Sequence, residues 1–238
     1  MTTYQEEYDH AKNDPEGYWK EKAQALSWYK QPETILSQDE HGIHHWFSDG
    51  EMNTAYMALD YHCENGRGEQ AALIYDSPVT NTKKTYSYNE LRDEVALTAG
   101  MLSAQGVGKG DRVIIYMPMI PEAAIAMLAC ARLGAIHSVV FGGFAPRELA
   151  VRIDDARPRV IMSASCGIEI KRVIEYKPLL DRAIEIAGHK PQHCIIFQRP
   201  EAVSEMTEGR DLDWKEALAV ASPAGCTPVN GSDDLYIL

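Results

Sequence analysis

From Ala71 onward, short apolar runs rich in β-branched residues alternate with stretches in which apolar residues recur at helical spacing. The runs predicted as strands are Ala71–Tyr75, Arg112–Met117, Ile136–Phe141, Val160–Ser163, Cys194–Phe197 and Leu235–Leu238. Helices are predicted near residues 87–105, 121–133, 146–155, 169–187 and 213–220. Such alternation is typical of βαβ units, so the sequence predicts an α/β fold with a mainly parallel sheet flanked by helices.

Residues 1–62 follow a different pattern, with helix-like stretches and little alternation of strand and helix. They hold Trp19, Trp28 and Trp46 out of the four tryptophans of the chain. We therefore predict an N-terminal extension over residues 1–62 and the main α/β domain over residues 63–238. Within that domain, Ser87 and Glu90 have the spacing of a capping box, which predicts a helix start.

The composition is that of a soluble globular protein, with 238 residues, 45% apolar and 24% charged. Lys and Arg number 23 against 35 Asp and Glu, and the net charge of −12 repels phosphate backbones and anionic lipid. No window approaches about 18 uninterrupted apolar residues. We therefore expect small-molecule partners, and neither nucleic acid nor a membrane.

The cysteines point to a reducing compartment. There are five, they stand far apart and no Cys-x-x-Cys pair occurs, which suits reduced thiols better than a disulfide framework. The N-terminus carries no basic segment followed by an apolar stretch. We therefore expect a cytoplasmic protein.

A glycine pair is the first candidate for ligand binding. The predicted strand Ile136–Phe141 runs into Gly142 and Gly143, and a helix begins near Pro146. The pair thus lies at the carboxyl end of a parallel strand, where α/β sheets bind ligands. Residues without Cβ let a ligand touch the backbone, but they also suit a tight turn that needs positive φ. The spacing alone leaves both interpretations open.

A second candidate loop is SASCGIEIKR, which follows the predicted strand Val160–Ser163. It places Lys171 and Arg172 beside a predicted helix start, and the donors of an arginine match the geometry of a phosphate. The alternative is a solvated Arg172 that pairs with Glu169 or Glu175.

Other motifs argue against an assembled catalytic set. The loop GVGKGD leads from a helix into a strand, whereas a phosphate-binding loop leads from a strand into a helix. The histidines lack metal-site spacing, and neither Gly-x-x-x-x-Gly-Lys-Ser/Thr nor Gly-x-Ser-x-Gly occurs. We therefore predict ligand-facing loops, without catalytic or metal-binding residues.

The chain resembles the N-terminal part of short-chain acyl-CoA synthetases in the acyl-adenylate-forming (AMP-binding) superfamily, nearest to propionate–CoA ligases and acetyl-CoA synthetases. The resemblance covers nearly the whole chain and rests on WFSDGEMNTAYMALDYH, TYSYNELRDEV, GDRVIIYMPMIPEAAIAMLACARLGAIHSVVFGGF, RIDDARPRVIMSASCGIE and YKPLLDRAI. The stretch GIEIKRVIEYKPLL favours the propionate-type branch over the acetate-type branch.

The resemblance implies a two-step ligase reaction. ATP and a carboxylate form an acyl-adenylate and pyrophosphate, and CoA then gives acyl-CoA and AMP, with Mg²⁺ as a further cofactor of the complete enzyme. Phe141, Gly142 and Gly143 match the loop against which CoA lies, and Arg172 and Ile174 match positions around its nucleotide end. One residue departs from the family: Glu169 stands where acetyl-CoA synthetases carry a second arginine, and it repels phosphate unless Lys171 or Arg172 screens it.

The resemblance also implies that parts of the ligase lie beyond this sequence. The apolar run Leu235–Leu238 resembles a buried strand that continues into the loop around the ATP phosphates, so residues 63–238 correspond to the first part of the AMP-binding domain. The acyl pocket, the magnesium-binding acid and the mobile C-terminal domain would follow. We expect no ligase activity from residues 1–238 alone, and the alternative function is a non-catalytic CoA-binding or interaction module.

Overall fold

The computed structural model describes residues 2–170 and 172–238, so Lys171, the predicted screen for Glu169, lies outside them. The helices are α1 Tyr4–Asn13, α2 Pro15–Ala23, η1 Tyr56–Asp60, η2 Cys63–Arg67, α3 Tyr88–Ala104, α4 Pro121–Leu133, α5 Pro146–Ala156, α6 Tyr176–Ile186 and α7 Trp214–Ala219. The strands are β1 Leu36–Gln38, β2 His44–Trp46, β3 Glu51–Met52, β4 Ala71–Ser77, β5 Thr82–Ser87, β6 Arg112–Met117, β7 Ile136–Phe141, β8 Val160–Ala164, β9 Cys166–Glu169, β10 Arg172–Glu175, β11 His193–Phe197, β12 Asp211–Asp213, β13 Val229–Asn230 and β14 Tyr236–Ile237. No helix among these residues is long and apolar enough to cross a membrane.

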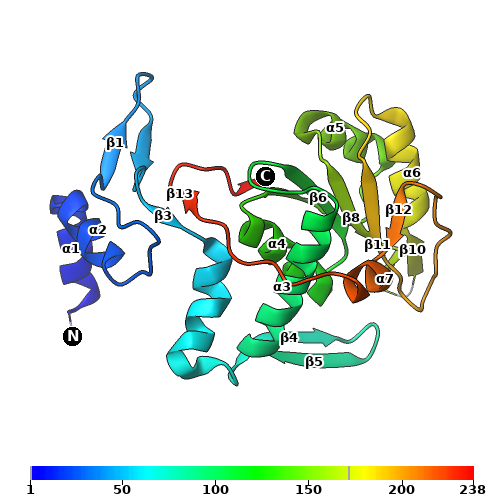
Figure 1. Cartoon of the computed structure of the whole chain (residues 1–238), viewed down its shortest axis with the longest axis horizontal. Helices are drawn as coiled ribbons and strands as arrows, with labels where there is room; N and C mark the ends of the chain where they lie inside the picture. Colours follow the sequence, from blue (N-terminus) through cyan, green and yellow to red (C-terminus); the bar gives the residue numbers. More distant parts are fainter. Residues whose placement is uncertain (1, 171) are drawn as a thin grey trace.

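A six-stranded parallel sheet forms the centre of the molecule, in the order β12-β11-β8-β6-β7-β14 (Figure 1). Strand β6 pairs with β7 from Arg112 opposite Ile136 to Met117 opposite Phe141. The predicted α/β fold with a mainly parallel sheet flanked by helices is therefore confirmed.

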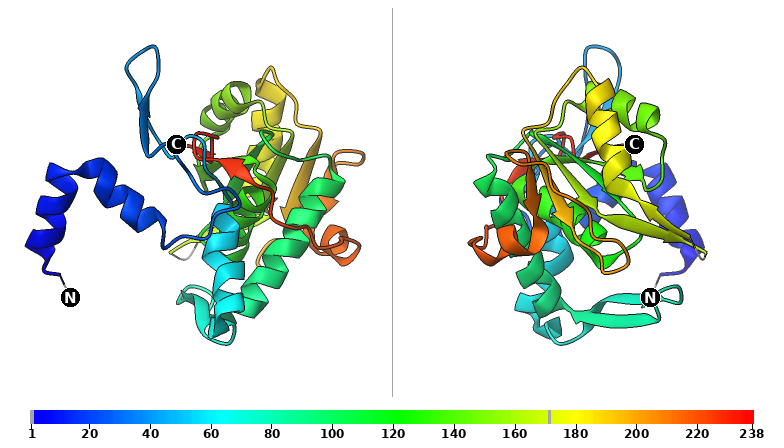
Figure 2. Two further views of the ribbon diagram at one scale, coloured as in Figure 1. Left: turned by 60° about the vertical axis from the view of Figure 1, so that its left-hand side comes forward. Right: turned by 90° about the vertical axis from the view of Figure 1, so that its right-hand side faces the viewer.

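Helices cover both faces of this sheet (Figure 2). Successive residues of a strand point to opposite faces, so Ile115 packs with α3, α4 and α7, whereas Ile114 and Tyr116 pack with α5 and α6. Residues 113–116 of β6 are therefore fully buried on both faces of the sheet. This burial explains why the strands read as continuous apolar runs in the sequence.

Local signals fix the ends of several helices. Ser87 Oγ accepts from the Glu90 amide at 3.2 Å, and the Glu90 carboxylate accepts from the Ser87 amide at 2.8 Å. This confirms the predicted capping box at α3. Proline begins α4 at Pro121 and α5 at Pro146, and Gly134 ends α4 in the left-handed conformation.

Two predicted elements before the last strand differ from the structure. Ala71–Tyr75 lies in β4, which pairs antiparallel with β5 and stands outside the central sheet. The predicted helix 169–187 begins only at Tyr176, because β9 and β10 form an antiparallel hairpin before it. The β-branched pair Val173 and Ile174 suits a strand as well as a helix, and pairing with β9 decides between them.

The apolar run near Leu238 forms a short edge strand instead of a buried one. Strand β14 pairs with β7, and Tyr236 lies opposite His137. Tyr236 and Leu238 are exposed. Within the described residues β14 has one neighbouring strand, so the burial expected from its apolar sequence is absent there.

The N-terminal helices and the β1–β2 hairpin lie beside the α/β part (Figure 1). Strand β3 joins the two regions because it pairs antiparallel with β13, which lies close to the other end of the chain. The predicted boundary after His62 lies within the helical stretch 54–67 and stays a prediction. The five cysteines are free thiols, and Cys130, Cys166 and Cys194 are buried.

Candidate functional site

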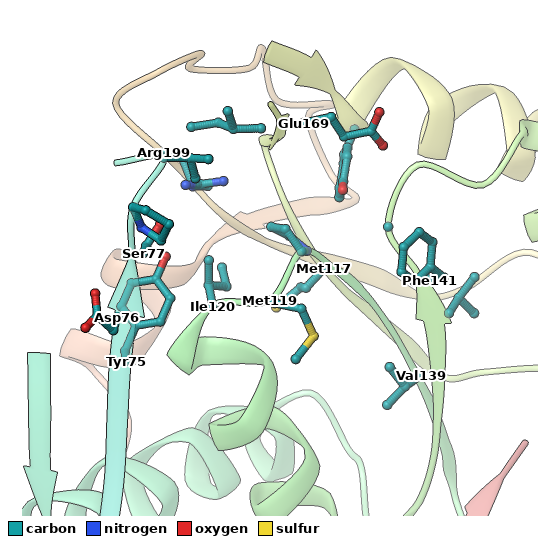
Figure 3. A pocket seen from close by; sticks show the side chains of 17 residues that line it. Tyr75, Asp76, Ser77, Met117, Met119, Ile120, Val139, Phe141, Glu169 and Arg199 are labelled. Carbon is teal, nitrogen blue, oxygen red and sulfur yellow. The ribbon is translucent and has the colours of Figure 1, made fainter. Parts of the chain in front are cut away.

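A cavity of about 360 Å³ lies at the carboxyl ends of β6 and β7. Its walls come from residues 75–79, 117–120, 139–142 and 168–169, together with Tyr176 and Arg199. In Figure 3, Tyr75 on β4 faces Phe141 on β7 across the opening, with Arg199 and Glu169 above. The carboxyl edge of a parallel sheet is the usual place for a ligand in α/β folds, and the cavity has the size of a small-molecule pocket.

The glycine pair forms the turn between β7 and α5. Gly143 has φ of +94°, a conformation that favours glycine. Gly142 has no positive φ, but a Cβ placed on it would lie 2.3 Å from the Tyr176 hydroxyl. A tight turn that needs positive φ therefore accounts for the glycine at position 143. Close packing against Tyr176 accounts for the glycine at position 142. Phe141 stands beside them with 70% of its surface exposed.

The β9–β10 hairpin supplies a second wall. Glu169 lines the cavity, and a Cβ on Gly143 would lie 3.3 Å from its Oε1. Arg172 is the cross-strand partner of Glu169, and Ile174 is that of Gly167. The structure thus brings Phe141 and Gly142 to the cavity, while Arg172 and Ile174 lie on the next strand, outside its walls.

One expectation about Arg172 is wrong. The sequence placed this residue beside a helix start, whereas it begins β10 and α6 starts four positions later at Tyr176. Arg172 is exposed. Its guanidinium is therefore held by a hairpin and not by the first turn of a helix.

Arg199 is a cavity residue that the sequence does not reveal. Only 7% of its surface is exposed. Its amide donates to Ser165 Oγ at 2.8 Å, its Nη1 donates to the Cys166 carbonyl at 3.1 Å, and its Nε lies 3.5 Å from Glu201 Oε2. A buried cation thus lies in a mainly apolar wall. Its position is fixed by hydrogen bonds to Ser165 and Cys166, at the start of β9. It comes from a loop after β11, so no local motif marks it.

Tyr176 is the other unpredicted cavity residue. Its ring lies 5.1 Å from that of Tyr116, whose hydroxyl donates to the Phe144 carbonyl at 3.1 Å. Burial raises the pKa of Tyr176 to about 12 and also raises the pKa of Tyr116. Both hydroxyls are protonated at neutral pH, and since Tyr116 already donates to Phe144, only the Tyr176 hydroxyl could donate to a ligand.

This set of side chains suits binding better than covalent chemistry. The walls combine apolar residues, a glycine turn and the Arg199 guanidinium. In the part of the chain that the structure describes, no group of three or more His, Cys, Asp or Glu residues is arranged to hold a metal ion. The cavity can therefore hold a ligand with an apolar portion, while the chemistry of that ligand needs further groups.

Comparison with known families identifies the class of protein. Residues 59–238 match the model of the AMP-binding enzyme family, and residues 4–58 match that of the acetyl-coenzyme A synthetase N-terminus. The chain belongs to the AMP-binding enzyme family. Together with its N-terminal segment and its relatives, this places it among the short-chain acyl-CoA synthetases, as the sequence motifs indicated.

Three curated relatives show the extent of the likeness. An uncharacterized protein of Pseudomonas aeruginosa is 59% identical over 236 residues, covering 99% of this chain and 38% of the relative. The mitochondrial acyl-CoA synthetase short-chain family member 3 of Rattus norvegicus is 52% identical, covering 94% and 33%. The propionate–CoA ligase of Salmonella typhimurium is 44% identical, covering 89% and 34%. The chain thus spans about a third of the length of these relatives.

A solved structure shares the fold. The acetoacetyl-CoA synthetase from Streptomyces lividans superposes with a TM-score of 0.88 and 22% sequence identity. The match covers 100% of this chain and 36% of that protein. The arrangement of sheet and helices described above is therefore that of the corresponding third of an acyl-CoA synthetase.

Proposed function

We propose that this chain forms the first part of an AMP-forming acid–thiol ligase. The complete enzyme would join a short-chain carboxylate to CoA, with ATP converted to AMP and pyrophosphate through an acyl-adenylate. The observation that carries the proposal is the match of residues 59–238 to the AMP-binding enzyme family, together with a cavity at the carboxyl edge of the sheet. The relatives span a longer sequence than this chain, which supports a ligase assembled from further segments.

Propionate is the acid we favour over acetate. The motif GIEIKRVIEYKPLL supports this choice, as does the propionate–CoA ligase of Salmonella typhimurium, which matches over 213 residues. The test is the ratio of kcat/KM for propionate and acetate in the complete ligase. A ratio in favour of acetate contradicts the choice of acid and leaves the ligase assignment in place.

For the cavity we propose a part in CoA binding. Phe141, Gly142 and Gly143 would lie along the CoA molecule, and Arg172 and Ile174 would lie toward its nucleotide end. Three features fit such a ligand: apolar walls for its chain, a turn without side chains, and the buried Arg199 for an anionic group. ATP and Mg²⁺ would be held by residues outside this sequence.

Residues 1–238 alone should not catalyse the reaction. Adenylation requires positioning of two substrates and neutralisation of charge at the α-phosphate, and the cavity offers one buried guanidinium, Arg199, which already lies 3.5 Å from Glu201 Oε2. The purified chain is incubated with ATP, propionate and CoA, and acyl-CoA is measured by chromatography. We expect none above the buffer control, and ATP-dependent formation of propionyl-CoA contradicts the prediction.

The second candidate function is a CoA-binding or interaction module without catalysis. It is favoured by one observation, that the cavity is assembled from residues 75–199 of this chain. The intact mass of the protein and the reading frame after Leu238 distinguish the candidates. A frame that continues into a Ser/Thr/Gly-rich loop favours the ligase, and a stop codon favours the module. Calorimetry with CoA then tests whether the module binds it.

The division of the chain and its compartment are part of the same proposal. We assign residues 1–62 to an extension of the acetyl-CoA synthetase type and residues 63–238 to the AMP-binding domain. We propose a cytoplasmic location, which the free cysteines support. The rat relative is named mitochondrial, so localisation of the tagged full-length protein is the test.

A further inference from the structure

The Tyr176 hydroxyl lies between two glycines that belong to different loops. A Cβ added to Gly142 would lie 2.3 Å from this oxygen, and one added to Gly167 would lie 2.4 Å from it. Neither glycine has a positive φ, so an alanine could adopt the backbone conformation of either. The missing side chains therefore make room for one tyrosine.

Those two glycines come from the two loops that the sequence selected as ligand-binding candidates. Gly142 lies in the turn from β7 to α5, and Gly167 lies in β9 of the hairpin. Tyr176 is the first residue of α6, and its amide donates to the Ser165 carbonyl at 2.9 Å, just before β9. The tyrosine is thus tied to the hairpin by its backbone and reaches the glycine turn with its ring.

The surroundings of the ring fix its position. Tyr116 packs against it from the central sheet, with ring centroids 5.1 Å apart. Only 3% of Tyr176 is exposed, yet the residue forms part of the cavity wall. The hydroxyl fills the space beside both glycines, where an added Cβ would lie within 2.4 Å of it. A buried ring of this size allows little independent movement of the loops that contact it.

We propose that Tyr176 is a positioning residue that couples the glycine turn to the β9–β10 hairpin. The ring fixes the distance between the glycine turn and the hairpin. The two cavity walls that carry Phe141 and Glu169 therefore keep a fixed position relative to each other. The coupling rests on contacts within the chain. Its consequence for affinity rests on the proposed function of the cavity in CoA binding.

A residue that only filled the core would behave differently. It would add to global stability and would still couple to a substitution at Gly142 or Gly167, because it contacts both. It would not pass a change in one loop on to the backbone of the other, whereas a positioning residue does. The coupling energy therefore tests the contact, and hydrogen exchange in the loop opposite the substitution tests the positioning role.

The experiment uses double-mutant cycles in the 238-residue chain. The variants are Gly142→Ala, Gly167→Ala and Tyr176→Leu, singly and in pairs, with Tyr176→Phe as the conservative replacement. Gly108→Ala is the matched control, since no atom lies within 4 Å of its added Cβ and it has no positive φ. CoA binding is measured by calorimetry, and hydrogen–deuterium exchange is followed over residues 141–145 and 165–170.

We expect Gly142→Ala to weaken CoA binding by about tenfold or more through overpacking against the ring. In the Tyr176→Leu background the same substitution should cost about twofold or less, because the clashing ring is gone. Gly108→Ala should stay within about twofold of the unsubstituted chain. In the Tyr176→Phe background Gly142→Ala should remain costly, because its added Cβ would still lie 2.7 Å from Cε2 of the ring. Gly142→Ala should also raise exchange in residues 165–170, because its added Cβ displaces the Tyr176 ring that contacts Gly167.

Additive costs at Gly142 and Tyr176 would overturn the coupling, and so would exchange that rises only around the substituted glycine. If Tyr176→Leu does not fold, the effect of each glycine variant on exchange in the opposite loop still decides the matter. If the unsubstituted chain binds no CoA, the CoA assignment for this chain fails. The exchange measurements then test the coupling by themselves.

Discussion

Arg132 and Asp60 form a two-point ion pair between α4 and the N-terminal helical stretch. The terminal nitrogens of Arg132 lie 2.7 and 3.1 Å from the two Asp60 oxygens, and the side chains are only 8% and 15% exposed. The Arg132 Nε also donates to the Ala224 carbonyl at 2.7 Å. One guanidinium thus joins three segments that are distant in sequence.

Replacing one partner of this pair should be costly. Arg132→Met leaves the Asp60 carboxylate without its counterion, and we expect the free energy of unfolding to fall by about 3 to 5 kcal/mol. Urea unfolding measures the change. The double variant Arg132→Met/Asp60→Leu should lose less than the sum of the single losses. Strict additivity would show that the pair contributes no coupling.

Asn53 should hold the N-terminal segment on the α/β part. Its buried amide nitrogen donates to the carbonyls of Ala131, Arg132 and Thr227, and its oxygen accepts from the Tyr56 amide at 3.0 Å. Asn53→Ala leaves these buried groups unpaired, so we expect a loss of about 2 to 3 kcal/mol in urea unfolding.

The Asn53 variant should also be cut faster by protease within residues 24–53, because β3 would be held less firmly. Asn65→Ala is the control, since this exposed residue makes a hydrogen bond of 2.7 Å to the Tyr61 carbonyl. Equal stability losses for both variants would argue against a special role of Asn53.

The strands of the central sheet could be predicted because they are buried on both faces. Arg112–Met117 and Ile136–Phe141 match β6 and β7 to the residue, since two covered faces leave an unbroken apolar run. Strand β5 was missed because its sequence TKKTYS is polar and mostly exposed. The hairpin before Tyr176 was missed because local pattern does not record pairing with β9.

The candidate site could be predicted only in part, for a related reason. Gly142 was found because the end of a parallel strand is visible in the sequence, and Phe141 followed from the family resemblance. Tyr176 and Arg199 reach the same cavity from other elements, and no spacing rule links them to it. Their contribution is set by tertiary packing, as the contact of Tyr176 with Gly142 illustrates.

Gly100 in α3 should resist a substitution that usually stabilises a helix. A Cβ at this position would lie 1.7 Å from the Ser222 carbonyl oxygen, in a segment tied to α3 by the Ala224 amide, which donates to the Ala96 carbonyl at 2.9 Å. Glycine to alanine inside a helix typically gains about 0.5 to 1 kcal/mol. Here we expect Gly100→Ala to lose about 1 to 3 kcal/mol by overpacking.

Thermal and urea unfolding of Gly100→Ala measure this loss. Gly225→Ala is the control, because no atom lies within 4 Å of its added Cβ. A stabilised Gly100→Ala variant would mean that residues 221–224 move aside at little cost.

The buried carboxylate of Asp211 should make stability depend on acid pH. Burial by itself raises its pKa, but hydrogen bonds from Arg210 and Lys177 outweigh burial and hold the pKa below the ordinary value. Arg210 Nε and Lys177 Nζ lie 2.7 and 2.9 Å from its oxygens. A lowered pKa in the folded state stabilises the fold above the unfolded pKa of about 3.9.

That stabilisation is lost as the pH falls through the folded pKa of Asp211, so the free energy of unfolding should decline steeply below about pH 4. Asp211→Asn should be less stable at neutral pH and should show a shallower decline. Urea unfolding from about pH 6 to about pH 2 measures both slopes. Asp155→Asn, an exposed position of α5, is the control. An unchanged slope in Asp211→Asn would remove Asp211 as the cause.

Arg172 and Glu169 should act on CoA in opposite directions. They are cross-strand partners in the hairpin, and a phosphate near them is attracted by the guanidinium and repelled by the carboxylate. In the complete ligase that we propose, Arg172→Ala should raise the KM for CoA about tenfold and leave the KM for ATP nearly unchanged. Glu169→Gln should lower the KM for CoA, because it removes the repulsion.

The control is Arg182→Ala, which removes an exposed arginine paired with Glu185 on α6. Steady-state kinetics at varied CoA and ATP separate the two constants, and an unchanged CoA dependence in Arg172→Ala would exclude this residue from the site.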